Sequence, residues 1–147
     1  MKTIGIIGGG QLGQMMAISA TYMGHKVITL DPDPNCPASL VAEQIVAKYD
    51  DTAAIAKLAA RADVLTYEFE NVSADALAPY EDKLPQGLDL VRISQNRIFE
   101  KDFLTKAGVK VAPYTVINTL EDLNDLDLSK KHVVKTATGG YDGHGQV

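Results

Sequence analysis

The stretch from residue 4 to residue 16 reads IGIIGGGQLGQMM, and it decides the expected fold. A β-branched run ends in glycines, and Gly8, Gly10 and Gly13 keep the GxGxxG spacing that joins a strand to the first turn of a helix in dinucleotide-binding units. Asp31 ends the next hydrophobic run about 20 residues later, as that fingerprint requires. Taken alone, the stretch favours a nicotinamide or flavin dinucleotide at the helix start, although the same glycines would also allow helix and strand to pack closely.

The first part of the chain alternates short β-branched runs with helical patterns. The expected strands are 4–7, 27–30, 43–47 and 64–67, and the expected helices are 11–23, 52–62 and one that begins at Ala74. The expected helix-end residues are Gly24, Asp51 or Thr52, Ser73 and Pro79. In the first helix, the expected inward side chains are Leu12, Met15, Met16 and Tyr22 or Met23. This alternation predicts the class α/β, with a Rossmann-like parallel sheet covered on both faces.

The pattern changes near Ile93, and we expect two domains, 1–96 and 97–147. In the second, a helix is expected over 98–108, with Ile98, Phe99, Phe103 and Leu104 inward. After it we expect an extended segment, a short helix over 120–126, a strand over 132–135 and its hairpin partner from residue 145. Because a strand pair cut at Val147 would leave unpaired edge groups, we expect the natural polypeptide to continue.

A second glycine cluster, GGYDGHGQV, covers residues 139–147 and follows Lys135 at the end of the expected strand. A glycine-rich turn between antiparallel strands with a nearby lysine is typical of a flap over a nucleoside triphosphate, because backbone amides and the ammonium group meet phosphate oxygens. The motif differs from a Walker A loop, since no GK[ST] opens a helix here. An exposed hairpin without a ligand is the alternative.

A third motif, YEFENV at residues 67–72, places Glu68 and Glu70 just after an expected strand. Ligands of open α/β sheets bind at that carboxyl edge. Carboxylates there can accept hydrogen bonds from ribose hydroxyls or from an amine. The alternative is an acidic strand end at the surface with no ligand.

Composition limits the partners. The 147 residues carry 14 Lys and Arg against 19 Asp and Glu, a net charge of -5, and this argues against a nucleic-acid partner. No run approaches the ~20 apolar residues of a membrane span, so we expect no membrane partner. Cys36 is the single cysteine, which favours a reducing compartment and a cytoplasmic location.

Five motifs occur together in one order: GIIGGGQLGQMM, LDPDPNCPA, YEFENV, SQNRIFEKDFL and VKTATGGYDGHGQ. In order and spacing they resemble the N5-carboxyaminoimidazole ribonucleotide synthetase family, the ATP-grasp ligases of purine biosynthesis. The resemblance implies a pre-ATP-grasp domain followed by the beginning of an ATP-grasp domain. It also implies that ATP and bicarbonate form carboxyphosphate, which carboxylates 5-aminoimidazole ribonucleotide. A dinucleotide would then have no role.

The resemblance also implies functions for particular residues. The implied substrate-binding residues are Gln11, Leu12, Glu70 and Tyr141, with Glu70 rather than Glu68 on the sugar. The implied ATP-binding residues are Arg97, Lys135, Gly140, Tyr141, Asp142, Gly143, His144, Gly145 and Gln146, and His144 is a second candidate for facing the ribonucleotide. Ligands for Mg²⁺ are expected beyond Val147, so this chain alone is expected to be inactive, and family members tend to be homodimers. The competing interpretations are an NAD-dependent oxidoreductase and another ATP-grasp carboxylase or formyltransferase.

Overall fold

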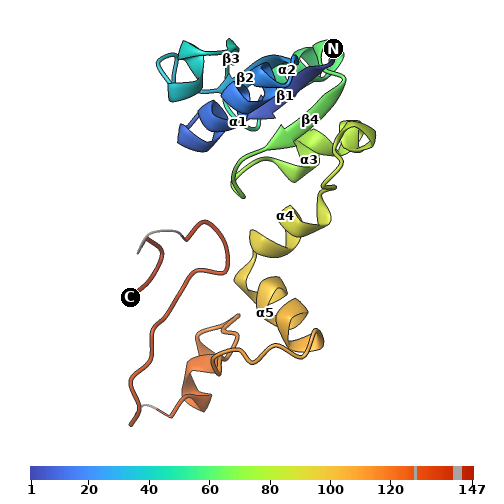
Figure 1. The fold of residues 1–147 in the computed structure, drawn as a ribbon. Coiled ribbons are helices and arrows are strands. Elements are labelled where there is room, and N and C mark those ends of the chain that lie inside the picture. Colours follow the sequence, from blue (N-terminus) through green and yellow to red (C-terminus); the bar gives the residue numbers. More distant parts are fainter. Residues whose placement is uncertain (128, 141–143) are drawn as a thin grey trace. The chain divides into compact units, whose positions relative to one another are not determined.

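The computed structural model describes residues 1–127, 129–140 and 144–147. The chain forms two compact units, Met1–Arg92 and Ile93–Val147 (Figure 1). The domain boundary expected between residues 96 and 97 stays a prediction.

The first unit is built on a parallel sheet of four strands. These are β1 (Thr3–Ile7), β2 (Lys26–Asp31), β3 (Glu43–Val46) and β4 (Val64–Tyr67). Their order is β3-β2-β1-β4, with every pair parallel. The α/β prediction is therefore confirmed. Because the chain moves outward from β1 to β3 and then returns to the other side of β1, the carboxyl ends of β1 and β4 form the switch point where open sheets of this kind bind ligands.

Helices connect and follow the strands. The α-helices are α1 (Gln11–Tyr22), α2 (Thr52–Arg61), α3 (Ala74–Leu77), α4 (Asp89–Ser94) and α5 (Arg97–Lys106). The 3-10 turns are η1 (Pro37–Leu40), η2 (Ala78–Lys83) and η3 (Glu121–Asp125). The expected caps are confirmed: the Asp51 carboxylate accepts from the Ala54 amide at 2.9 Å and the Ser73 hydroxyl from the Ala76 amide at 3.2 Å. The α4 helix was not expected from the sequence.

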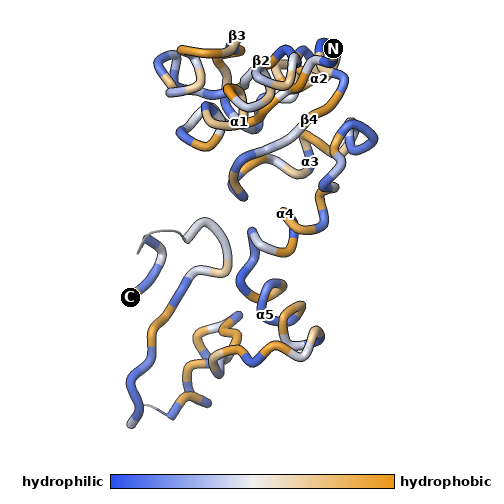
Figure 2. Tube along the Cα trace, in the orientation of Figure 1, coloured by the Kyte–Doolittle hydropathy of each residue, from blue (hydrophilic) through white to orange (hydrophobic). Residues whose placement is uncertain are grey.

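The core lies on both faces of the sheet. In Figure 2, hydrophobic stretches of the first unit alternate with hydrophilic ones. Ile6 belongs to a small cluster with Ala17 of α1, whereas its neighbour Ile7 belongs to a larger cluster with Leu58 of α2 and Leu77 of α3. Because successive side chains of a strand point to opposite faces, this alternation shows that helices cover both sides.

The buried face of α1 differs from the expected one. Leu12, Met15, Tyr22 and Met23 are exposed, and of the expected inward residues only Met16 packs partly against the core. The residues that face the sheet are Gly13, Ala17 and Ala20. A side chain at Gly13 would overlap the carbonyl oxygen of Gly8, so α1 lies too close to the loop after β1 for large residues.

The second unit contains less regular structure than expected. Helix α5 is capped by Asn96, whose side chain accepts from the Ile98 amide at 2.9 Å. None of its residues is buried, and Phe99 and Phe103 are exposed, contrary to the expected inward face. The expected helix over 120–126 is a 3-10 turn. The expected strand over 132–135 is reduced to one antiparallel bridge, Lys135 with Gln146.

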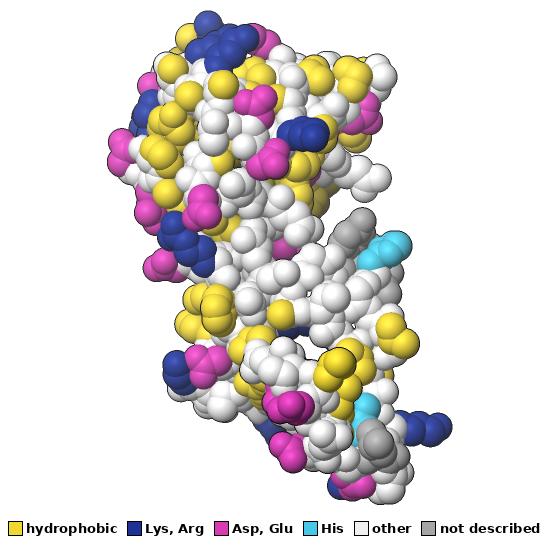
Figure 3. Space-filling model, turned by 180° about the vertical axis from the view of Figure 1, so that it is seen from behind, with side chains coloured by type: hydrophobic (Ala, Val, Ile, Leu, Met, Phe, Trp, Pro, Cys, Tyr) yellow, Lys and Arg dark blue, Asp and Glu magenta, His cyan; other side chains and the backbone are white. Residues whose placement is uncertain are grey.

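The surface is mixed in character. On the face shown in Figure 3, acidic, basic and apolar side chains are interspersed. Among the described residues, no helix has both the length and the apolar character needed to cross a membrane.

Candidate functional site

The candidate site of the first unit lies at the switch point of the sheet. The loop that follows β1 starts with Gly8, whose amide donates to the Leu30 carbonyl at 2.9 Å, and the loop that follows β4 starts with Glu68, whose amide donates to the Ile7 carbonyl at 3.2 Å. These backbone bonds extend the β1·β2 and β1·β4 pairings by one step. The glycine loop and the acidic motif therefore meet at the carboxyl edge of the sheet, which is where the sequence analysis placed the acidic motif.

The Glu68 carboxylate lies on the glycine loop. One oxygen accepts from the Gly10 amide at 2.9 Å and the other from the Gly13 amide at 2.5 Å. Both amides belong to the first turn of α1, where backbone N–H groups have no carbonyl partner within the helix. The negative charge of Glu68 therefore stabilises the start of α1 through hydrogen bonds and through the helix dipole.

The amides of Gln11 and Leu12 lie between those two. The first hydrogen bond of α1 runs from the Gln14 amide to the Gly10 carbonyl at 2.9 Å. Among the residues that the structure describes, the amides of Gln11 and Leu12 have no hydrogen-bond acceptor, and both residues are exposed. These two amides are available to a ligand at the switch point.

Asp31, at the end of β2, is buried and hydrogen-bonded to other residues of the protein. It is 6% exposed, and its carboxylate accepts from the Gly9 amide at 2.7 Å, the Tyr49 hydroxyl at 2.7 Å and the Asp33 amide at 2.9 Å. Burial, and then the hydrogen bond to Asp31, raises the pKa of Tyr49 well above its usual value. This carboxylate therefore ties the glycine loop to the loop after β2.

The dinucleotide interpretation is not supported by this geometry. The position for a pyrophosphate at the start of α1 holds the Glu68 carboxylate. Asp31, the acid that completes the fingerprint, accepts from three donors of the protein itself. The glycines at positions 8, 10 and 13 thus serve close packing around a protein carboxylate.

The second unit holds the other predicted site residues. The Arg97 amide donates to the Ala137 carbonyl at 2.8 Å, and its guanidinium donates to the Gly140 carbonyl at 3.2 Å. The Lys135 to Gln146 bridge is followed by a bond from the Thr136 amide to the Gly145 carbonyl at 2.8 Å. Arg97 is therefore brought to the glycine turn that Lys135 begins.

The residues predicted to form the flap differ in exposure, and some of them lie outside the described part of the chain. Gly140 is partly buried, and Lys135, His144, Gly145 and Gln146 are exposed. Tyr141, Asp142 and Gly143 lie outside the described residues. In the described part of the chain, no group of His, Cys, Asp and Glu side chains could hold a metal ion.

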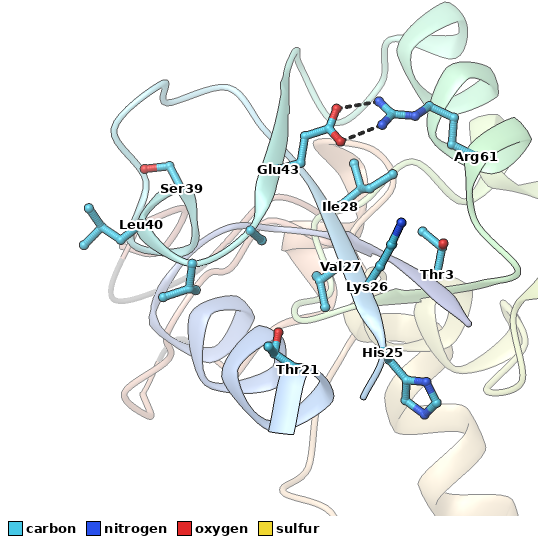
Figure 4. Close-up of a pocket in the computed structure, with 12 residues that line it drawn as sticks. Thr3, Thr21, His25, Lys26, Val27, Ile28, Ser39, Leu40, Glu43 and Arg61 are labelled. Carbon is cyan, nitrogen blue, oxygen red and sulfur yellow. Dashed lines mark hydrogen bonds and ion pairs between the residues drawn. The ribbon is translucent and has the colours of Figure 1, made fainter. Parts of the chain in front are cut away.

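A cavity of about 740 Å³ lies at the opposite edge of the sheet (Figure 4). Its lining includes Thr3, Lys26 and Glu43, the first residues of β1, β2 and β3. Glu43 pairs with Arg61 at 2.6 Å in the lining of this cavity, with both side chains exposed. None of the predicted site residues lines the cavity, so it is separate from the switch point.

A comparison with protein families decides the relationship. The model described as the ribonucleotide synthetase preATP-grasp domain matches residues 1–86. The chain belongs to this family. The matched segment of this preATP-grasp domain contains the whole parallel sheet, the glycine loop and Glu68.

Known relatives of this preATP-grasp chain are longer. It is 51% identical to the N5-carboxyaminoimidazole ribonucleotide synthase of Staphylococcus haemolyticus, over 99% of this chain and 40% of that protein. The Staphylococcus aureus N5-carboxyaminoimidazole synthetase complexed with ADP superposes with a TM-score of 0.91 at 48% identity, and the Aspergillus clavatus synthase in complex with ADP and 5-aminoimidazole ribonucleotide with 0.81 at 27%. Each superposition covers 99% of this chain and 40% of the relative.

Sequence reasoning missed the position of Glu68 in the preATP-grasp domain. It preferred Glu70 as the functional acid, but Glu70 is exposed beyond the end of β4, and its carboxylate accepts from the side-chain Nδ2 of Asn71 at 3.4 Å. The available signal was the end of the strand: Tyr67 closes β4, so Glu68 is the first side chain that can reach the neighbouring loop. The role of Glu70 stays a prediction.

Proposed function

We propose that this chain is the N-terminal part of an N5-carboxyaminoimidazole ribonucleotide synthase. In the proposed reaction, ATP phosphorylates bicarbonate to carboxyphosphate, and the amine of 5-aminoimidazole ribonucleotide attacks its carbonyl carbon and displaces phosphate. The observation that carries the proposal is the 51% identity to a synthase of that name over 99% of this chain. The complexes of relatives with ADP and with the ribonucleotide support the two proposed ligands.

The ribonucleotide is proposed to bind at the switch point of the first unit. Gln11 and Leu12 are exposed residues of the first turn of α1, whose amides have no carbonyl partner within the helix and can donate to oxygens of the substrate. Glu70, exposed on the loop after β4, is proposed to accept from a sugar hydroxyl. Tyr141 is proposed as a further contact.

ATP is proposed to bind at the glycine turn of the second unit. Arg97 and Lys135 would neutralise phosphate charge, and backbone amides of residues 140–146 would donate to phosphate oxygens. Gly139 and Gly145 have φ values of 71° and 68°, the left-handed conformation in which glycine lets such amides turn toward a ligand. Mg²⁺ is proposed to be held by acidic residues beyond Val147.

Replacement of Lys135 in the whole synthase tests the ATP site. Lys135→Ala should raise KM for ATP and lower turnover by about 10- to 100-fold, because a charge-assisted hydrogen bond to phosphate is lost. Lys131→Ala, four residues earlier and also exposed, is the matched control and should leave both constants unchanged. Equal kinetics for Lys135→Ala and the unmodified synthase would remove this lysine from the site.

Replacement of Glu70 tests the ribonucleotide site separately. In the whole synthase, Glu70→Ala should spare ATP hydrolysis that depends on bicarbonate and raise KM for 5-aminoimidazole ribonucleotide. ATP consumption and product formation are measured in parallel. If both fall together, Glu70 has a structural role and the ribonucleotide assignment fails.

The cellular setting is also proposed. The free, buried thiol of Cys36 is compatible with a reducing compartment, and we propose a cytoplasmic enzyme. We also propose a homodimer, because members of the resembled family tend to be homodimers.

A further inference from the structure

Glu68 occupies the position at which a GxGxxG loop would otherwise bind phosphate. Four backbone amides at the start of α1 have no partner within the helix. The Glu68 carboxylate accepts hydrogen bonds from the first and the last of them, the amides of Gly10 and Gly13. A phosphate group at this helix start would need the same donors, and it would also lie beside a negative charge that is already in place.

The position of the Glu68 carboxylate explains why the loop requires glycine at three positions. A side chain at Gly8 would overlap Cγ of Glu68, and one at Gly10 would lie 2.9 Å from its Oε1 atom. At Gly13 an added carbon would overlap the Gly8 carbonyl and would lie 3.4 Å from Oε2 of Glu68. All three positions of the fingerprint are therefore small because Glu68 and the loop itself fill the space.

The backbone holds Glu68 in this position. Its amide bonds to the Ile7 carbonyl, one residue after the Ile7 and Tyr67 pair of the β1·β4 ladder. The side chain thus leaves a strand end that the sheet fixes, and it is partly buried.

We propose that Glu68 is a specificity-determining residue that acts as an internal anion and excludes phosphate and pyrophosphate groups from the first turn of α1. A ligand at the switch point then presents uncharged donors and acceptors, and not its phosphate, to this turn. This inference concerns the glycine loop alone and holds whether or not the whole protein is a carboxylating ligase.

Titration with inorganic pyrophosphate tests the inference on this chain. Binding is followed by the ¹H–¹⁵N resonances of Gly10 and Gly13 in the unmodified chain, in Glu68→Gln and in Asp50→Asn. Asp50 is exposed, so its replacement removes the same charge from the surface of the first unit. Glu68→Gln should bind pyrophosphate at least about tenfold more tightly than the other two, with shifts centred on residues 8–13. Equal affinity in all three proteins would overturn the proposal.

Two measurements keep the test decisive if Glu68→Gln does not fold. In the unmodified chain, the Gly10 and Gly13 amide protons should exchange slowly with solvent and should not shift on addition of pyrophosphate. A shift at these two amides in the unmodified chain would overturn the proposal without any variant. In Glu68→Asp, the shorter side chain should release one of the two amides but still prevent pyrophosphate from binding, because the negative charge remains. Tight binding of pyrophosphate by Glu68→Asp would also contradict the proposal.

Discussion

Gly13 is the residue at which α1 comes closest to the loop after β1. An added methyl group would overlap the Gly8 carbonyl oxygen, a backbone atom that cannot rotate away. We expect Gly13→Ala to lower the free energy of unfolding by about 2–3 kcal/mol, measured by urea denaturation. Ser19→Ala, at an exposed position of the same helix, is the control and should change it by less than about 0.5 kcal/mol. Similar values for the two variants would show that α1 can move away from the loop.

Tyr49 gives the fold a pH dependence. Its hydroxyl donates to Asp31, and burial followed by this hydrogen bond raises its pKa in the folded state. The neutral phenol is thus favoured by folding, so the stabilisation is complete below the unfolded pKa of about 10 and is lost as the pH rises above that value. Tyr49→Phe should cost about 1–2 kcal/mol at pH 7, because Asp31 loses one donor.

The measurement for Tyr49 is urea denaturation of both proteins at pH 7 and at pH 11. The difference in unfolding free energy between the unmodified chain and Tyr49→Phe should become smaller at the higher pH. A difference that stays constant or grows would show that folding does not raise the pKa of Tyr49.

At the scale of the element, α1 shows what periodicity can and cannot predict. The helix itself was predicted, but the larger apolar side chains were assigned to its inner face, and Leu12 and Met15 are exposed. The large apolar side chains predict that their face packs on the sheet. The close approach at Gly13 instead requires small residues on the packed face. The second constraint depends on tertiary packing, which local sequence does not contain.

Ala17, completely buried on the inner face of α1, tests this orientation. Ala17→Leu should lower the free energy of unfolding by about 1–3 kcal/mol, because the added carbons have no space against the sheet. Met15→Ala, on the exposed face, should change it by less than about 0.5 kcal/mol. Chemical denaturation of both variants decides the matter, and the opposite ranking would show that the outer face is the packed one.

The strands and caps of the first unit were predictable because their signals are local. A β-branched run that ends in glycine, or a Ser or Asp before a helix, acts within a few residues, and Asp51 and Ser73 form the expected caps. The bridge between Lys135 and Gln146 was predicted only as part of a longer hairpin, since its extent depends on neighbouring strands. Of the site, the place of the acidic motif at the carboxyl edge of the sheet was predictable, and so was the end of β4 at Tyr67. The hydrogen bonds of Glu68 to the Gly10 and Gly13 amides were not, because they depend on how closely the loop after β1 approaches.

At the scale of the whole molecule, the buried core belongs to one of the two units. The described residues that are buried all lie between positions 5 and 91, and among the described residues of Ile93–Val147 none is buried. Cooperative unfolding requires a buried apolar core, because apolar burial is the dominant favourable contribution to folding and gives unfolding its large heat-capacity change. The two units should therefore differ sharply in autonomous stability.

Calorimetry of two separate pieces measures this difference. Residues 1–95, which include α4 and the complete core, should unfold in one transition with an enthalpy of about 60–70 kcal/mol, as expected for their length. Residues 93–147 should show no cooperative transition, since local caps such as Asn96 on α5 cannot replace a core. A sharp transition for residues 93–147 alone would mean that its side chains reach a packed arrangement by themselves. Failure of residues 1–95 to unfold cooperatively would show that the sheet with Glu68 on its glycine loop is not an autonomous folding unit.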